Sequence, residues 1–84
     1  MYSIEVKKRA QKEIDALPRK EQERVIAAFE ILQDDPFVGK KLEGKYEGVR
    51  SLRVWPYRIL YVIHKEIVTV TVLRVAHRQG VYND

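Results

Sequence analysis

The last third of the chain contains three runs rich in Val, Ile, Leu, Thr and Tyr, and the breaks between them are very short. The runs cover residues 49–54, 57–63 and 67–76, and their composition is typical of β-strands. Trp55-Pro56 and His64-Lys65-Glu66 are too short for a crossover connection, so consecutive strands must turn back as hairpins. This region is therefore constrained to an antiparallel sheet.

The first half of the chain changes from strand to helix patterning. Residues 2–6 alternate apolar and polar side chains, which predicts a short strand. From Lys7 a helical period takes over and ends at Pro18, which is also tolerated in the first turn of a following helix. The second helix should stop by Asp34-Asp35-Pro36. Its predicted apolar stripe consists of Val25, Ile26, Phe29 and Leu32.

The predicted order is strand, helix, helix, strand, strand, strand, with a loop over residues 37–46. We therefore expect an α+β fold, β-α-α-β-β-β, in which a helical hairpin packs on one face of an antiparallel sheet and leaves the other face or its rim open. With 84 residues, the chain should form one domain spanning residues 1–84.

Composition excludes several kinds of chemistry. The chain has no cysteine, which rules out a disulfide, a thiolate nucleophile and a Cys-type zinc site. We expect no metal and no cofactor. No signal peptide and no apolar run long enough to span a bilayer is evident, so we expect a cytoplasmic protein without a membrane partner.

The net positive charge of the chain comes from the strand region. Residues 1–47 carry ten basic and ten acidic side chains, whereas residues 48–82 carry six Lys or Arg and one acid, Glu66. A field of this sign favours a polyanionic partner, most commonly a nucleic acid.

Four residues of this region are candidates for catalysis. The alternation of strand side chains places Arg53 off the core face. Arg58 should lie on the same side as Leu60 and Val62 near the start of its strand, where its long side chain can leave the core and reach the rim, just across the Trp55-Pro56 turn from Arg53. Arg78 and Tyr82 follow the last strand, where Gly80 would let the tail fold back. Whether they reach the other two depends on the fold.

Together these groups suit cleavage of RNA by attack of a ribose 2′-hydroxyl on the adjacent phosphate. Arginine stabilises phosphate charge but is a poor base, so Tyr82 or His77 would transfer protons. Simpler interpretations stand beside this one. Exposed arginines in sheets are commonly solvated, and Trp55 commonly packs on a hairpin. His77 is compatible with a surface histidine, and Lys40, Lys41 and Lys45 with either a phosphate grip or a mobile loop.

Several motifs resemble the RelE/ParE superfamily of toxins from toxin–antitoxin pairs, over nearly the whole chain. They are Leu42-Glu43-Gly44, Leu52-Arg53-Val54, Tyr57-Arg58-Ile59-Leu60-Tyr61, Val75-Ala76-His77-Arg78 and Val81-Tyr82. RelE-like members are mRNA interferases that cut the messenger in the ribosomal A site, whereas ParE-like members poison DNA gyrase and lack the catalytic cations and tail tyrosine. The tail here favours the RelE-like class.

The resemblance also implies residue roles. Arg53 would help activate or stabilise, Arg58 and Arg78 would be phosphate and transition-state cations, and Tyr82 would stack on or orient the cut nucleotide. RelE has a lysine at the place of Ser51, with Arg50 beside it here on the other face. The predicted RNA-binding residues are Arg50, Ser51, His77, Lys40, Lys41 and Lys45.

The implied partners are a cognate RelB-like antitoxin, the ribosome and mRNA, with operator DNA reached only through the antitoxin complex. An acidic amphipathic antitoxin segment would suit the basic surface. Two alternatives remain open at this point: a ParE-like gyrase inhibitor without catalytic activity, and a degenerate family member that only binds an antitoxin.

Overall fold

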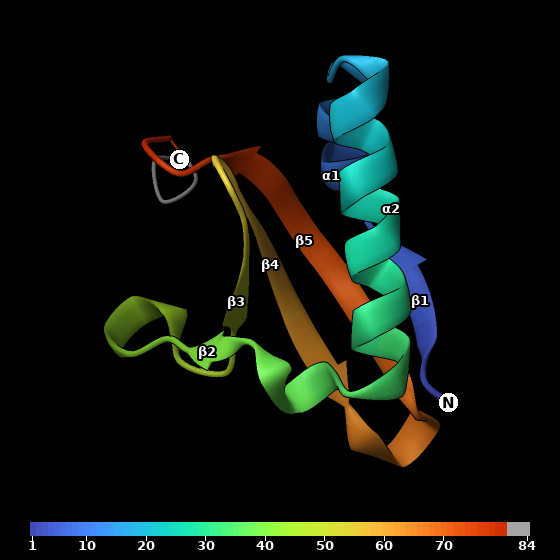
Figure 1. Ribbon diagram of the computed structural model, residues 1–84. Helices are drawn as coiled ribbons and strands as arrows, with labels where there is room; N and C mark the ends of the chain where they lie inside the picture. Colours follow the sequence, from blue (N-terminus) through green and yellow to red (C-terminus); the bar gives the residue numbers. More distant parts are fainter. Residues whose placement is uncertain (81–84) are drawn as a thin grey trace.

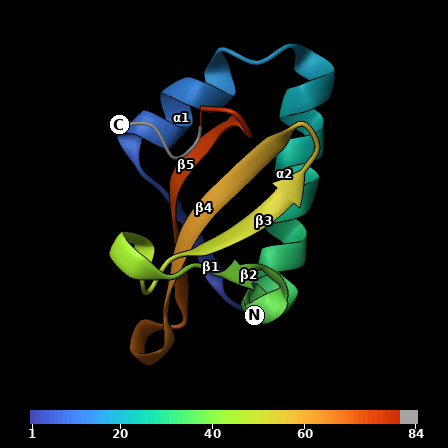
Figure 2. The same cartoon turned by 90° about the vertical axis from the view of Figure 1, so that its left-hand side faces the viewer.

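Two helices cover one side of a five-stranded sheet in the computed structural model, which describes residues 1–80. Figure 1 shows α1 and α2 on that side, and the opposite side of the sheet, which faces the viewer in Figure 2, is not covered by either of them. The sheet order is β1-β5-β4-β3-β2. The elements are β1 (Ser3–Val6), α1 (Lys8–Asp15), α2 (Arg19–Asp34), β2 (Lys40–Lys41), β3 (Arg50–Val54), β4 (Tyr57–His64) and β5 (Thr69–His77).

The predicted α+β fold is confirmed, with one strand direction that the sequence did not assign. Strands β2 to β5 pair antiparallel, whereas β1 runs parallel to β5 with Ser3 opposite Thr69. Because β1 is connected to the sheet through the two helices and not through a short turn, no hairpin constrains its direction. No helix within residues 1–80 is long and apolar enough to cross a membrane.

The loop predicted for residues 37–46 is wrong in part. Lys40 and Lys41 form β2, and 3₁₀ turns occupy Pro36–Val38 and Gly44–Tyr46. Local sequence patterns do not predict this strand, because its partner is β3, ten residues further along the chain. The turn between β4 and β5 is also longer than expected. A 3₁₀ turn at Lys65–Ile67 and the left-handed Val68, with φ of 50°, delay the start of β5.

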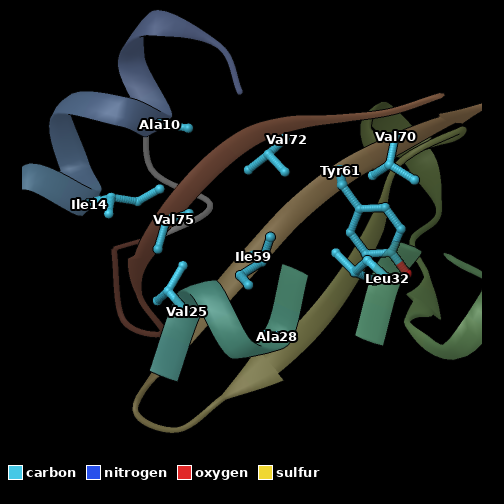
Figure 3. Close-up of a cluster of buried hydrophobic side chains, with 10 residues drawn as sticks. All are labelled: Ala10, Ile14, Val25, Ala28, Leu32, Ile59, Tyr61, Val70, Val72 and Val75. Carbon is cyan, nitrogen blue, oxygen red and sulfur yellow. The ribbon is translucent and has the colours of Figure 1, made fainter. Parts of the chain in front are cut away.

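The core lies between the helices and the sheet (Figure 3). In α2 the buried positions are Val25, Ala28 and Leu32, spaced three and four residues apart as one helix face requires. Ile26, which we assigned to this stripe, is instead 53% exposed. The buried cluster consists of Ala10, Ile14, Val25, Ala28, Leu32, Ile59, Tyr61, Val70, Val72 and Val75.

Tyr61 links this core to the segment that carries β2. Its hydroxyl donates a hydrogen bond to the carbonyl of Pro36 at 2.7 Å and accepts one from the N–H of Gly39 at 3.0 Å. Burial raises the pKa of Tyr61 above its ordinary value of 10.0, although the Gly39 N–H opposes this shift. A Cβ at position 39 would collide with the Tyr61 hydroxyl, which explains the glycine. The tyrosine thus holds β2 against the sheet.

Candidate nucleic-acid interface

Arg53 and Arg58 face each other on the open side of the sheet. They are register partners on β3 and β4, next to the turn at Trp55-Pro56. Leu52 and Val54 pack against the core on the helix side, so the alternation of strand side chains turns Arg53, and with it Arg58, to the other side. The predicted juxtaposition of these two residues is confirmed.

This arginine pair has no compensating acid among residues 1–80. No carboxylate of that part of the chain lies within ion-pair distance of Arg53 or Arg58. Like charges directly opposite on neighbouring strands destabilise a sheet. A phosphate bound between the two guanidinium groups would remove that repulsion, and the planar donor forks match phosphate oxygens.

Arg78 is attached to the same turn by two contacts. Its backbone N–H donates to the carbonyl of Pro56 at 2.9 Å, and its guanidinium carbon lies 4.7 Å from the centroid of the Trp55 ring. The residue is exposed and follows the end of β5. The fold therefore brings Arg78 to the end of the sheet where Arg53 and Arg58 lie, as the catalytic interpretation requires.

Two other arginines of the strand region have structural partners. The guanidinium of Arg50 donates to the carbonyls of Phe37 at 3.1 Å and Gly39 at 2.8 Å. Arg74 donates to Glu13 from Nε at 2.9 Å and from a terminal nitrogen at 2.8 Å, and the other oxygen of Glu13 accepts the N–H of Val75 at 2.9 Å. Arg50 was predicted to bind RNA, but the structure holds it against the loop at the other end of β3.

The lysines of the 37–46 segment are divided between the two sides of the sheet. Lys40 is opposite Ser51, which shares the open side with Arg53, whereas Lys41 is opposite Arg50. Lys40 is exposed, so its ammonium can extend over the open side. Lys45 lies in the turn at Gly44–Tyr46, with Nζ 5.3 Å from the Tyr46 ring centroid.

Ser51 is buried, with 4% of its surface exposed. Its hydroxyl has no hydrogen-bond partner within residues 1–80. It occupies the place where the resemblance expects a lysine, so on this strand the structure offers no base there. Its opposite neighbour Lys40 is the amine that the register brings to the same side.

His77 lies on the other side of the sheet from the arginine pair. It is opposite Tyr57, and the two rings make an edge contact at 6.1 Å and 83°. Its Nδ1 accepts the backbone N–H of Gln79 at 3.3 Å. The register therefore does not bring His77, which was predicted to bind RNA, together with Arg53 and Arg58.

Tyr82, the fourth catalytic candidate, lies outside the described residues. Within residues 1–80 no group of three or more His, Asp or Glu side chains could hold a metal ion. Two surface hollows are lined by residues 41–44 with 47–50, and by α2 with residues 52–55. Arg53 lines the second of these hollows, and neither of the two includes Arg58 or Arg78.

The sequence did not predict that Trp55 is a neighbour of Arg78, or that Glu13 bonds Arg74 and Val75 of β5. Both contacts join residues more than 20 positions apart. A Trp-Pro turn beside two strand arginines was a usable signal for Trp55, whereas nothing in the local pattern around Glu13 predicted its role.

A helical hairpin on one side of a five-stranded sheet is the fold of the small α+β toxins of the RelE-like class. Residues 4–82 match the family model described as ParE toxin of type II toxin-antitoxin system, parDE. The chain belongs to this RelE/ParE family of toxins from type II toxin–antitoxin systems.

Individual relatives agree with this assignment. The chain is 36% identical over 83 residues to Toxin RelG of Mycobacterium tuberculosis, covering 96% of this chain and 95% of the relative. A chain of the RelBE2 toxin–antitoxin complex from the same organism is 37% identical, with a TM-score of 0.85 over 92% of this chain and 98% of that one. The isolated RelE toxin of E. coli shares the fold, with a TM-score of 0.81 at 24% identity over 92% of this chain and 84% of that one.

Proposed function

We propose that this toxin is a ribosome-dependent endoribonuclease that cuts mRNA in the A site. The observation that supports this best is the cross-strand pair of Arg53 and Arg58, which lacks an acidic partner within residues 1–80, with Arg78 attached to the adjoining turn. Two arginines on the open face and a third on the adjoining turn can together contact a single phosphodiester.

In the proposed reaction the ribose 2′-oxygen attacks the adjacent phosphorus while the bond from phosphorus to the 5′-oxygen breaks. A base takes the 2′ proton, an acid protonates the departing 5′-oxygen, and the products are a 2′,3′-cyclic phosphate and a 5′-hydroxyl. Arg53, Arg58 and Arg78 stabilise the charge that accumulates on the phosphoryl oxygens. We assign nucleotide orientation and proton transfer to Tyr82, since His77 faces the other side of the sheet.

Lys40 completes the proposed phosphate-binding face. Diagonal neighbours on one side of an antiparallel pair have Cβ atoms about 7–8 Å apart, and Lys40 stands in this relation to Arg53 through Ser51. Both side chains are long enough to reach one backbone phosphate. Lys45 would contact flanking phosphates, whereas Lys41 and Arg50 project from the other side of β2 and β3.

The openness of the site supports dependence on the ribosome. Arg58 and Arg78 lie outside the two hollows described above, and Arg78 is exposed. A larger particle that presents the messenger in a fixed geometry would supply the orientation that such a surface lacks.

A RelB-like antitoxin is the partner that the relatives support, since RelBE complexes are among the similar structures. We propose that an acidic segment of that antitoxin covers the arginine face and blocks the messenger. Operator DNA would be bound only through this complex. We place the free toxin in the cytoplasm, where ribosomes and message are found.

The test is primer extension on a defined message with purified ribosomes, comparing wild-type protein with Arg58→Ala and Tyr82→Phe. We expect discrete cuts at the A-site codon that survive a chelator, and a loss of about 10²–10³ in rate for Arg58→Ala. Arg19→Ala is the matched control, because Arg19 is an exposed arginine on α2 whose pair with Glu23 spans 3.8 Å. It should cut at the wild-type rate.

The ParE description of the matching family model favours inhibition of DNA gyrase as a second candidate. A folded wild-type protein that makes no cuts, but traps gyrase on DNA, would replace the nuclease proposal with this one. A protein that does neither, and that cells without antitoxin tolerate, would be a degenerate antitoxin-binding member.

A further inference from the structure

Trp55 is the single tryptophan of the chain and stands at the turn between β3 and β4. It is 52% exposed, which is unusual for the largest apolar side chain in a protein of this size. It adds little to the core, since the buried cluster and the residues packed against it do not include it. Its position therefore needs an explanation other than core packing.

The contact that Trp55 does make is with Arg78. The guanidinium carbon lies 4.7 Å from the indole centroid, well inside the distance of about 6 Å at which a cation is attracted to the ring face. No carboxylate of residues 1–80 pairs with Arg78. Within that part of the chain, the indole is therefore the group that stabilises this charge.

Arg78 needs such a restraint if it acts on a phosphate. It lies in the turn of residues 78–80, outside the sheet, and its backbone is attached to β4 by the bond from its N–H to Pro56 at 2.9 Å. That bond fixes the Cα but leaves a long, flexible side chain in solvent. Ordering such a side chain only when substrate binds would lower the rate, because its rotamer freedom is lost at that step.

We propose that Trp55 is a positioning residue for RNA cleavage, which holds the guanidinium of Arg78 over its ring and so keeps it directed toward the phosphate between Arg53 and Arg58. The inference rests on the proposed nuclease function. Trp55 acts through Arg78 and does not itself contact the RNA.

A double-mutant cycle tests this with Trp55→Leu, Arg78→Ala and the double variant in the ribosome cleavage assay. Loss of an exposed cation–π contact should reduce the rate about two- to fivefold in Trp55→Leu, and Trp55→Phe should recover part of it. In the Arg78→Ala background the same change should cause no further loss, because the group that Trp55 holds is gone. Equal losses in both backgrounds would show that Trp55 contacts RNA directly and would overturn the proposal.

Phe37→Leu is the matched control. Phe37 is 44% exposed and also lies beside cations, with Arg50 at 5.2 Å and Lys65 at 5.3 Å, but at the other end of β3. Its removal should leave cleavage unchanged, and urea unfolding of each variant would show that the fold is intact.

A second measurement is independent of activity. The proton resonances of the Arg78 side chain should show an upfield ring-current shift in wild-type protein that disappears in Trp55→Leu, and unchanged shifts would refute the contact. A wild-type protein that cuts no RNA would refute the proposed function and the catalytic part of this inference. An active wild type with equal rates in Trp55→Leu would refute the inference alone.

Discussion

Replacing Tyr61 with Phe removes one side-chain oxygen. Among such single-oxygen removals from the residues described here, we expect this one to destabilise the protein most. The hydroxyl bonds Pro36 at 2.7 Å and Gly39 at 3.0 Å, and all three residues are buried. Each buried backbone group that loses its partner costs about 1–3 kcal/mol. Because two groups are affected, we expect the free energy of unfolding to fall by about 2–6 kcal/mol, a large part of the roughly 5–15 kcal/mol of a typical domain.

Urea unfolding followed by circular dichroism measures this loss. For a small domain the free energy of unfolding changes by about 1 kcal/mol per molar urea, so the midpoint should fall by about 2 M or more. Tyr57→Phe is the matched control in the same strand, because the Tyr57 hydroxyl makes no hydrogen bond within residues 1–80. A midpoint shift for Tyr61→Phe no larger than that of Tyr57→Phe would refute the reasoning.

Three further outcomes are expected. Burial raises the pKa of Tyr61, so the contribution of its neutral hydroxyl to stability is complete below pH 10.0 and is lost as pH rises through the higher folded-state pKa. The difference in free energy of unfolding between wild type and Tyr61→Phe, measured by urea unfolding, should therefore become smaller above pH 10.0. Lys40→Ala should lower ribosomal cleavage by about tenfold, and Lys41→Ala, which removes the same charge from the other side of β2, should lower it much less; equal losses would contradict the register argument. Glu13→Gln should lower the free energy of unfolding in urea by about 1–3 kcal/mol and accelerate hydrogen exchange at the Val75 N–H. Unaltered exchange would show that the bond to Glu13 does not protect the part of β5 that extends beyond β1.

The sequence predicted those parts of the site that lie on adjacent strands of a hairpin. Arg53 and Arg58 flank a two-residue turn, and the shortness of that turn was enough to place them near each other, whereas their common face follows from the register of β3 and β4. His77 was a candidate for proton transfer and RNA binding at this site, but its register with Tyr57 places it on the helix side. A shift of one residue along a strand changes the face, so closeness in sequence could not decide this.

Contacts between distant segments could not be predicted in the same way. The short strand β2 has no periodicity of its own, and it exists because Tyr61 and Arg50 hold the preceding residues against the sheet. The stacking of Arg78 on Trp55 likewise joins two turns that meet only after β3, β4 and β5 have paired.

The amino-acid sequence by itself determined the order and type of most of the elements, the helical hairpin on an antiparallel sheet and the concentration of positive charge in the strand region. Hydrophobic periodicity and turn length are local properties, and local properties are sufficient for those conclusions. The tertiary structure alone decided which cations share a face without an acid among residues 1–80, and which are bound to carbonyls or to Glu13. That choice depends on strand register and on the packing of helices against the sheet edge, which bring together residues that no local pattern relates.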